Sequence, residues 1–413
     1  DYIKHSYHGG WCYLVKGKEK QIKHNGTTAD VNSLYPSMMS SESGNWYPFK
    51  EPTFWKGDYI PLEAMEIGKY YFVRFTTRFY IRPNKLPFIQ IKNTFRYRAT
   101  EMLETSDVLN EETGEYCKEI INLNHEVVLT TVTLTMTMTD FKLFKEHYEL
   151  VDFEILDGCY FNAAFGIFDE YINKYKEIKL RSKGAQRELA KLFLNNLYGK
   201  MASSTSSSFK VAYDKGDGVI GFYTQPENDK LPGFIAVGSA ITSYARNFTI
   251  RAAQANYYGP DKPGFIYADT DSIHCDLPPE QIKGITVHPK NFCCWKLESR
   301  WDTGWFVRQK TYIEHVTHED CELIDNPYYN IRCAGMPESC KKLFLKSIEG
   351  WNDEEKETMT DPEKQFLYED KECTKPIRRT IEDFTIGLSV PGKLLPKRIP
   401  GGVLLVDTDY KMR

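Results

Sequence analysis

The stretch Gly264-Phe-Ile-Tyr-Ala-Asp-Thr-Asp-Ser-Ile-His274 decides how the chain is interpreted. Apolar residues of strand type run up to Tyr267 and resume at Ile273, with a short polar break between them. This pattern predicts a hairpin that carries its charges at the turn. Asp269 and Asp271 lie two residues apart, and in extended backbone that spacing would place both carboxylates on one side of the chain, against a buried strand. Water competes poorly there for a bound cation.

A second stretch, Ala29-Asp-Val-Asn-Ser-Leu-Tyr-Pro-Ser37, has the same build, with apolar residues on both sides of Asp30. Pro36 is expected to end regular strand pairing and to hold Tyr35 in an extended conformation. Three strand-borne carboxylates would make a two-metal site, in which two magnesium ions about 3.5–4 Å apart clamp the attacking and leaving oxygens of an in-line phosphoryl displacement. Asp-Thr-Asp is also common turn chemistry, so the other stretches must decide between the two interpretations.

The composition describes a globular chain with free thiols. Its 413 residues are enough for two or three compact units with a sizeable core. A hydrophobic fraction of 41%, a charged fraction of 27% and a mean hydropathy of -0.50 are typical of soluble proteins. No apolar run approaches the length of a membrane span, and no signal peptide is recognisable. The 10 cysteines form neither Cys-x-x-Cys pairs nor a zinc pattern, which favours a reducing cytosol.

The net charge of -4 neither supports nor excludes a nucleic-acid partner, because a large enzyme can be mildly acidic and still bind DNA through local basic surfaces. The chain contains 27 tyrosines and 24 phenylalanines, so many rings remain for stacking on bases or sugars. It starts at Asp1 without an initiator methionine. We therefore expect a processed or trimmed piece of something longer.

The N-terminal part opens with Tyr7-His-Gly-Gly10, followed by alternating apolar residues. The glycine pair would let the backbone approach a ligand closely, although a turn at the entry to a strand is the plainer explanation. From about residue 42 to 166 the chain becomes loop-rich and then strand-like at 70–81 and 127–138. This change in character predicts an α+β insertion.

Residues 168–200 are predicted to be helical, in two pieces broken around Ser182-Lys-Gly184. In the second piece four polar residues follow an i, i+4, i+8, i+11 path and so line one face, namely Arg187, Lys191, Asn195 and Tyr198. Cations suit phosphates and a ring suits a base, whereas a solvated polar stripe is the structural alternative. Lys179, at the end of the first piece, would face the same groove.

The remaining segments alternate between hairpins and helices. A hairpin is predicted around Asp214-Lys-Gly-Asp-Gly218 and a long helix over 236–257. After the Asp269 hairpin, Arg308-Gln-Lys-Thr-Tyr-Ile313 is predicted to form a strand on which Lys310 and Tyr312 share a face, a pair suited to one phosphate and one sugar or base.

The C-terminal part begins with a charge-dense stretch over 343–373, which predicts a solvated helical insertion. A strand through Val403-Leu-Leu-Val406 ends the chain. The basic residues of this part would suit contacts to a duplex backbone.

In order along the chain, these stretches resemble the polymerase motifs of family B DNA polymerases: Asp-Val-Asn-Ser-Leu-Tyr-Pro, Lys191-x3-Asn195-x2-Tyr198-Gly, Tyr267-x-Asp-Thr-Asp271 and Lys310-x-Tyr312. Further stretches are similar to the protein-primed branch, especially the phi-29-like phage enzymes: Tyr7-x-Gly-Gly10, Arg308-Gln-Lys-Thr-Tyr-Ile313, Cys333-Ala-Gly-Met336 and Pro400-Gly-Gly-Val403. The resemblance covers essentially the whole chain.

The fold implied by the resemblance is α+β, a right-hand polymerase with palm, fingers and thumb and two terminal-protein-region insertions. The implied domains are the N-terminal part of the palm at 1–41, the first terminal-protein-region insertion at 42–166, the fingers at 167–204, the second terminal-protein-region hairpin at 205–234, the palm with the catalytic hairpin and primer-grip strand at 235–332, and the thumb with a charged insertion at 333–413. In that family the second insertion encircles DNA and supports processivity and strand displacement.

The resemblance also implies site residues. The catalytic carboxylates would be Asp30, Asp269 and Asp271, with Asp30, Asp271 and the carbonyl of Val31 as metal ligands. Tyr35 would lie under the deoxyribose as a gate against a 2′-hydroxyl. The implied nucleotide-binding residues are Val31, Leu34, Tyr35, Lys179, Lys191, Asn195 and Tyr198. The implied DNA-binding residues are Tyr7, Gly9 and Gly10 for the template strand, Lys310 and Tyr312 for the primer end, and Arg187 and Thr270.

The implied cofactors are two Mg²⁺ ions, which Mn²⁺ could replace. The implied partners are a DNA primer–template, dNTPs and a terminal protein primer, and no membrane is involved. The protein would act as a monomer in the cytoplasm of the host cell.

Two departures from the family stand out. Asn196 occupies a position where the motif usually has serine, and the chain begins too close to Tyr7-x-Gly-Gly10 for an N-terminal 3′–5′ exonuclease domain. Either the piece was trimmed or the protein naturally lacks proofreading. Without that domain we expect weaker strand displacement and processivity than in full-length relatives.

Two other functions are compatible with parts of this pattern. One is a polymerase that uses another substrate, such as a primase-like or RNA-synthesising relative, which Tyr35 argues against. The other is a catalytically silent or weak module that binds DNA or a terminal protein. All three predicted metal-site aspartates are present, which argues against the silent module.

Overall fold

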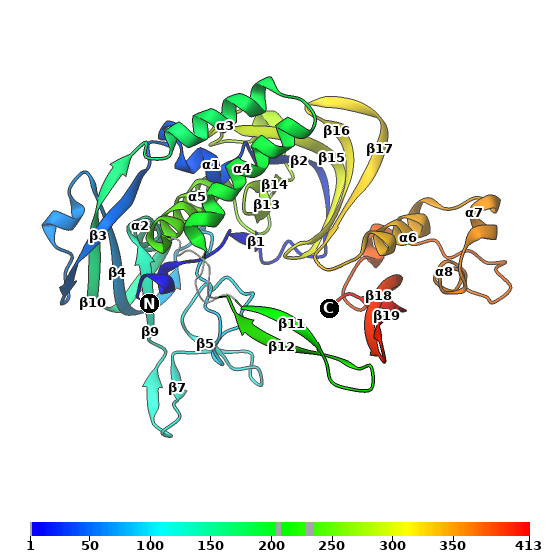
Figure 1. The fold of residues 1–413 in the computed structure, drawn as a ribbon, viewed down its shortest axis with the longest axis horizontal. Coiled ribbons are helices and arrows are strands. Elements are labelled where there is room, and N and C mark those ends of the chain that lie inside the picture. Colours follow the sequence, from blue (N-terminus) through cyan, green and yellow to red (C-terminus); the bar gives the residue numbers. More distant parts are fainter. Residues whose placement is uncertain (1, 204–207, 228–233) are drawn as a thin grey trace.

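In the computed structural model, residues 2–203, 208–227 and 234–413 are described (Figure 1). Parts of the predicted hairpin domain at 205–234 lie outside these residues. The described chain mixes helices and sheets, which confirms the α+β prediction. No helix within the described ranges is long and apolar enough to cross a membrane. The described residues also include five short 3₁₀ helices, at Ile3–Ser6, Ser41–Ser43, Leu62–Met65, Pro279–Gln281 and Ile381–Asp383.

A seven-stranded antiparallel sheet carries the predicted catalytic motifs. Its strand order is β1 (Cys12–Leu14), β13 (Phe265–Asp269), β14 (Ser272–Cys275), β2 (Ile22–Val31), β15 (Trp295–Arg308), β16 (Thr311–Glu319) and β17 (Glu322–Cys333). The hairpin predicted around Asp269 is therefore confirmed, and it pairs with the strand that carries Asp30. Segments far apart in the sequence thus meet at the centre of one sheet.

The long helix predicted over 236–257 is found as α5 (Ile235–Ala255), and it packs against this sheet. Its buried residues are mostly small, because Ala, Gly and Ser let a helix approach neighbouring elements closely. Ser6 lies against Ser239 of this helix with 2.7 Å between their hydroxyl oxygens. The helix also contacts β13 and β14, the two strands of the Asp269 hairpin.

Residues 42–166 form a second, four-stranded antiparallel sheet with one helix. The strand order is β3 (Trp46–Lys56), β10 (Tyr148–Phe165), β4 (Lys69–Ile81) and β9 (Val132–Thr137), and helix α2 (Met138–His147) follows β9. Four short strands, β5 (Val108–Leu109), β6 (Tyr116–Cys117), β7 (Glu119–Ile121) and β8 (Val127–Leu129), pair as two small hairpins. The β7–β8 hairpin projects from the body of the molecule in Figure 1.

Helices α3 (Asp169–Arg181) and α4 (Ala185–Ala202) form an antiparallel pair beside the first sheet (Figure 1). The predicted break between them is confirmed, and Gly184 takes the positive φ of +63° that the turn requires. Strands β11 (Ser208–Asp214) and β12 (Ile220–Pro226) form the hairpin that was predicted around residues 214–218.

The C-terminal part contains α6 (Glu338–Glu349), α7 (Asp353–Thr358), α8 (Asp361–Leu367) and the hairpin of β18 (Ser389–Ile399) and β19 (Gly402–Lys411). The predicted solvated helical insertion at 343–373 is only partly correct. Phe344, Phe366 and Leu367 are buried in a separate hydrophobic core, to which Trp305 of the first sheet also belongs. Charged residues dominate the sequence here, but apolar residues at helical spacing supply this buried face.

The tips of two distant hairpins meet. Val219, in the β11–β12 turn, forms a β-bridge with Pro400 in the β18–β19 turn. The guanidinium of Arg398 lies 4.8 Å from the ring centroid of Phe222. The two hairpins are therefore joined where their turns meet (Figure 1).

Candidate active site

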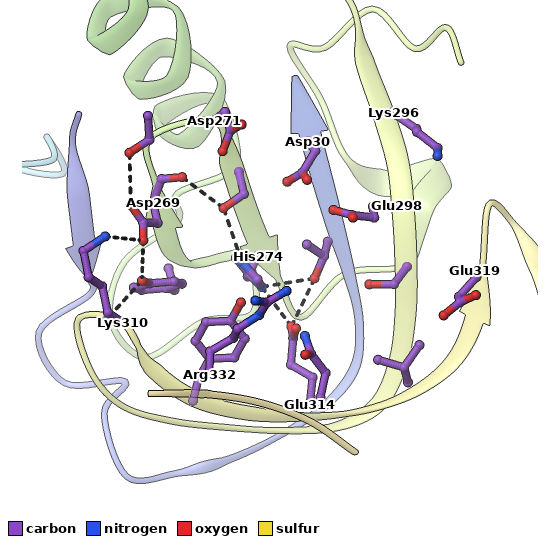
Figure 2. Close-up of a pocket in the computed structure, with 18 of the residues that line it drawn as sticks. Asp30, Asp269, Asp271, His274, Lys296, Glu298, Lys310, Glu314, Glu319 and Arg332 are labelled. Carbon is purple, nitrogen blue, oxygen red and sulfur yellow. Dashed lines mark hydrogen bonds and ion pairs between the residues drawn. The ribbon is translucent and has the colours of Figure 1, made fainter. Parts of the chain in front are cut away.

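Two cavities meet at the predicted carboxylates. The first, of about 800 Å³, lies over the seven-stranded sheet, and Figure 2 shows its lining. The second, of about 410 Å³, lies between that sheet and helices α3 and α4. Five residues line both cavities: Asp30, Thr270, Asp271, Lys296 and Glu298. The carboxylates thus stand at the junction of an acidic cavity and a strongly basic one.

The strand register brings Asp30 and Asp271 together. Asp30 of β2 lies directly opposite Ser272 of β14, and the backbone N–H of Val31 donates to the carbonyl of Asp271 at 2.8 Å. Burial, a hydrogen bond with Glu298 and the nearby charge of Asp271 raise the pKa of Asp30 well above its usual range. Burial also raises the pKa of Asp271. Carboxylates crowded in this way stabilise a bound cation.

The extended backbone expected across Asp269 to Asp271 is not found. Thr270 has a φ of +54° and forms the turn, so the two carboxylates do not project from one straight strand. Asp269 instead forms an ion pair with Lys310, with 2.8 Å between Oδ2 and Nζ (Figure 2). It also accepts a hydrogen bond from the Thr270 hydroxyl at 3.1 Å. Asp269 is thus adjacent to the Asp30–Asp271 pair but neutralised by its own partner.

The donor set fits Mg²⁺ when substrate oxygens complete it. Among the described residues, no three His, Cys, Asp or Glu side chains form a group that could hold a metal ion by themselves. Mg²⁺ is commonly held by one or two carboxylates together with water and substrate phosphates, and it prefers hard oxygen ligands. Asp30 and Asp271 provide such carboxylates, and Glu298 lies beside them.

A buried polar cluster beneath the carboxylates was not predicted. Nδ1 of His274 lies 2.8 Å from Oε2 of Glu314, and the Thr28 hydroxyl contacts both at 3.0 and 3.1 Å. His274 and Glu314 are 2% and 1% exposed, so the cluster is almost fully buried in the wall of the first cavity. Because its three residues come from β14, β16 and β2, it fixes these strands relative to one another.

The second cavity unites residues predicted to bind a nucleotide. Six of the seven line it, namely Val31, Leu34, Tyr35, Lys179, Lys191 and Asn195, whereas Tyr198 does not. Arg187, predicted to bind DNA, also lines this cavity. Tyr35 lies in helix α1 (Leu34–Met39), so the prediction that Pro36 holds it in an extended conformation is wrong. Proline is tolerated in the first turn of a helix, where its missing N–H has no helical partner. The Tyr35 ring stacks on Tyr198 of α4, with centroids 4.4 Å apart.

Tyr198 connects this cavity to the N-terminal motif, because its hydroxyl is hydrogen-bonded to the hydroxyl of Tyr7. Gly10 in turn packs directly on the turn at Thr270, between Asp269 and Asp271. A Cβ placed there would lie 2.3 Å from Oγ1 of Thr270, and the N–H of Thr270 donates to the carbonyl of Trp11 at 2.7 Å. Tyr7, Gly9 and Gly10 line a third cavity of about 680 Å³. They are therefore adjacent to the carboxylates but face a different groove.

The backbone of this motif is held by a buried ion pair. Arg246 of α5 donates to the carbonyls of His8 and Gly9 at 2.5 and 2.8 Å. Its other terminal nitrogen lies 2.6 Å from Oδ2 of Asp140 in α2, and both side chains are 5% exposed. Since 106 residues separate the pair, no local sequence signal predicts it.

Lys310 and Tyr312 both line the first cavity, but the strand predicted through them is interrupted. Lys310 has a φ of +59° and forms the turn between β15 and β16. Its N–H donates to the hydroxyl of Tyr267 at 2.9 Å. Tyr312 stacks on Phe306 with centroids 5.4 Å apart, so the ring is fixed at the cavity wall.

Lys296, Glu298 and Arg332 also line the first cavity and were missed in the sequence (Figure 2). Lys296 and Glu298 lie two positions apart on one strand. This spacing points to the site only once their strand is known to pair with β2. Arg332 lies near the end of β17 and offers no local pattern.

Comparisons with known proteins agree with this arrangement. The model of a family described as "DNA polymerase type B, organellar and viral" matches residues 1–283. The DNA polymerase of Bacillus phage Nf is 34% identical over 100% of this chain and 62% of its own length, and that of Bacillus phage phi29 is 33% identical with the same coverage. The DNA polymerase of Streptococcus phage Cp-1 is 29% identical over 96% of this chain and 59% of its own length.

A solved structure of phi29 DNA polymerase complexed with primer-template DNA and incoming nucleotide substrates superposes with a TM-score of 0.76 and 30% identity. The superposition covers 100% of this chain and 62% of the phi29 polymerase chain. The orthorhombic crystal form of phi29 DNA polymerase gives a TM-score of 0.75 at the same identity. The chain thus spans about 62% of the length of these relatives.

Proposed function

Because the chain belongs to the type B DNA polymerases of organelles and viruses, we propose that it extends a DNA primer with deoxynucleotides under the direction of a template strand. The observation that carries this proposal is the junction of the two cavities at Asp30 and Asp271. Such a junction brings a polyphosphate, held by cations, to carboxylates that can hold a divalent metal. The first cavity then receives the primer end.

Lys179 of α3 and Lys191 of α4 would hold the triphosphate. Lys179, Arg187 and Lys191 surround the second cavity, and burial lowers the pKa of Lys179 with help from these two neighbouring cations. A bound polyphosphate would compensate their mutual repulsion. Lys179 also reaches Ser33 at 3.4 Å, directly after the strand that carries Asp30. The triphosphate would therefore end beside the carboxylates.

The ring of Tyr35 would support the sugar, and its stack on Tyr198 limits its movement. A rigid ring at this position leaves little space for a 2′-hydroxyl. Asn195 and Tyr198 lie on the same face of α4 and would border the nascent base pair.

Asp30 and Asp271, with the carbonyl of Val31, would hold two Mg²⁺ ions, which Mn²⁺ could replace. When bound, such ions activate the primer 3′-oxygen and neutralise charge on the leaving pyrophosphate. Lys310 and Tyr312 would hold the primer end, and the ion pair of Lys310 with Asp269 positions that cation at the edge of the site. Tyr7, Gly9, Gly10, Arg187 and Thr270 would contact DNA.

The domain assignment is part of the proposal. The seven-stranded sheet and α5 support a palm at 1–41 and 235–332, and the α3–α4 pair supports fingers at 167–204. The second sheet would be the first terminal-protein-region insertion at 42–166. The β11–β12 hairpin would represent the second at 205–234, and the C-terminal helices and hairpin the thumb at 333–413.

The partners follow from the same relatives. The solved structure of phi29 DNA polymerase complexed with primer-template DNA and incoming nucleotide substrates supports DNA and dNTPs as partners here. We propose further that the protein acts as a monomer in the cytoplasm of a phage-infected cell and accepts a terminal protein as primer.

Primer extension tests the proposal. A labelled primer–template is supplied with Mg²⁺ and either dNTPs or rNTPs, using the wild-type chain and Asp271→Asn. We expect extension with dNTPs alone, abolished by Asp271→Asn, while DNA binding measured by anisotropy is retained. Absence of extension by a folded wild-type chain that binds DNA would instead identify a catalytically silent binding module.

A further inference from the structure

Lys296 is the one cation of the seven-stranded sheet that lines both cavities in the described part of the chain. It lies on β15 directly opposite Asp30 of β2. Side chains of directly opposed residues in an antiparallel pair point to the same face, with Cβ atoms about 4.5–5.5 Å apart. The stem of Lys296 thus leaves the sheet next to the Asp30 carboxylate.

The other cations of the second cavity have different origins. Lys176, Lys179, Arg187 and Lys191 come from α3 and α4, and Lys290 comes from the loop before β15. Lys176 is engaged by Glu42 at 3.0 Å. Lys296 therefore adds positive charge from the sheet, where the carboxylates stand, to a cavity otherwise charged by the helices and a loop.

The ammonium of Lys296 is held to one side by Asp320. Nζ lies 2.7 Å from Oδ1 of Asp320, with 39% and 67% of the two side chains exposed. A pair this exposed contributes little to stability, so a more highly charged anion can displace Asp320. The turn that carries Asp320 has its own anchor, because the N–H of Asp320 donates to the carbonyl of Glu298 at 3.1 Å. The ion pair is thus not needed to fasten the turn.

We propose that Lys296 is a substrate-binding residue that leaves Asp320 to contact the terminal phosphates of the incoming nucleotide, and afterwards the pyrophosphate product. This inference rests on the proposed function and deepens it. The ligand class is a polyphosphate accompanied by Mg²⁺. Lys296 would supply a mobile point charge, which suits a group that must be held during the reaction and then released.

Four variants of the full chain test the inference. Lys296→Met removes the charge, and Lys296→Arg retains it. Asp320→Ala frees Lys296 from its partner. Lys23→Met is the matched control, because Lys23 lies on β2 opposite Gly304 of β15, in the same pair of strands but away from the cavities. The measurements are KM and kcat for dATP in primer extension, inhibition by pyrophosphate, and calorimetric titration of each protein with dATP and Mg²⁺.

We expect Lys296→Met to raise the KM and the dissociation constant for dATP about tenfold, equivalent to about 1.4 kcal/mol, and to weaken pyrophosphate inhibition similarly. Lys296→Arg and Lys23→Met should stay within about twofold of wild type. Asp320→Ala should bind dATP equally or more tightly. A purely structural ion pair predicts the opposite, namely that Asp320→Ala is as defective as Lys296→Met, and this result would overturn the inference.

The same data separate this inference from the proposed function. If the wild-type chain does not extend a primer but Lys296→Met weakens dATP binding in the titration, the polymerase proposal fails, and only the binding of a nucleotide polyphosphate by Lys296 stands. If extension occurs and Lys296→Met binds dATP and pyrophosphate as wild type does, the inference fails and the polymerase proposal stands. If the wild-type chain neither extends nor binds dATP, both fail.

Discussion

Replacing either member of the buried Asp140–Arg246 pair should destabilise the protein and also release the N-terminal motif. Both side chains are 5% exposed, and Arg246 also donates to the carbonyls of His8 and Gly9 and to the hydroxyl of Ser243. Removing one partner of such a pair leaves an uncompensated buried charge and costs about 3–5 kcal/mol. With a shift of about 2–4 °C per kcal/mol, Asp140→Asn or Arg246→Met should lower the unfolding midpoint by on the order of 10 °C.

The double variant makes this reasoning specific. Asp140→Asn combined with Arg246→Met leaves no isolated buried charge, so its loss of stability should be smaller than the sum of the single losses by about 1–3 kcal/mol. Binding of a fluorescent template strand should not recover in the double variant, because the carbonyls of His8 and Gly9 still lack their donor. Denaturation and anisotropy measured on the same samples provide both results.

An exposed pair between the same two helices supplies the control. Nη2 of Arg251 in α5 lies 3.1 Å from Oε2 of Glu146 in α2, and 46% and 39% of these two side chains are exposed. Arg251→Met should change stability by less than about 1 kcal/mol and leave template binding unchanged. Strictly additive single losses at Asp140 and Arg246, or recovery of template binding in the double variant, would refute the account of this pair.

Three further predictions address the site and its surroundings. Gly10→Ala should reduce extension more than tenfold, because the new Cβ would lie 2.3 Å from Oγ1 of Thr270, and adding Thr270→Gly should restore part of the activity; no rescue in extension assays would contradict the steric reasoning. Asp30→Asn should raise the unfolding midpoint of the metal-free protein while abolishing its further rise with Mg²⁺, because it relieves the crowding with Glu298 and Asp271; a lower midpoint without metal would contradict this. Burial lowers the pKa of His147, so the native state favours the neutral ring; stability from this group is complete above its ordinary pKa of about 6.5 and falls as pH drops below it, and His147→Gln should flatten that acid limb in thermal unfolding at pH 5 to 8, whereas an unchanged limb would rule out this origin.

The sequence predicts the elements that carry strong local patterns. The Asp269 hairpin, the break around Gly184 and the long helix of α5 are all found, because alternation, turn glycines and helical periodicity are local properties. The meeting of Asp30 with Asp271 was expected from the resemblance, and strand pairing brings it about.

The failures have physical causes that local patterns do not reveal. Tyr35 can lie in a helix because Pro36 occupies the first turn of that helix, where proline is tolerated. Thr270 and Lys310 adopt positive φ values at turns that a pattern of apolar residues cannot distinguish from a continuing strand.

Long-range pairing accounts for the residues that the sequence did not indicate. Lys296 acquires its place from the register of β15 with β2, and Arg246 meets Asp140 only because α5 packs on α2. Such pairs depend on the tertiary structure, so residue type and spacing alone do not predict them.

Single-nucleotide incorporation tests the central claim most directly. Four primer–templates that differ only in the templating base are each mixed with one dNTP at a time, Mg²⁺ and the wild-type chain, Asp30→Asn or Asp271→Asn. The account predicts that the wild-type chain adds only the complementary nucleotide and that both variants add none while still binding DNA. Incorporation that ignores the templating base, or that survives in Asp271→Asn, would contradict it.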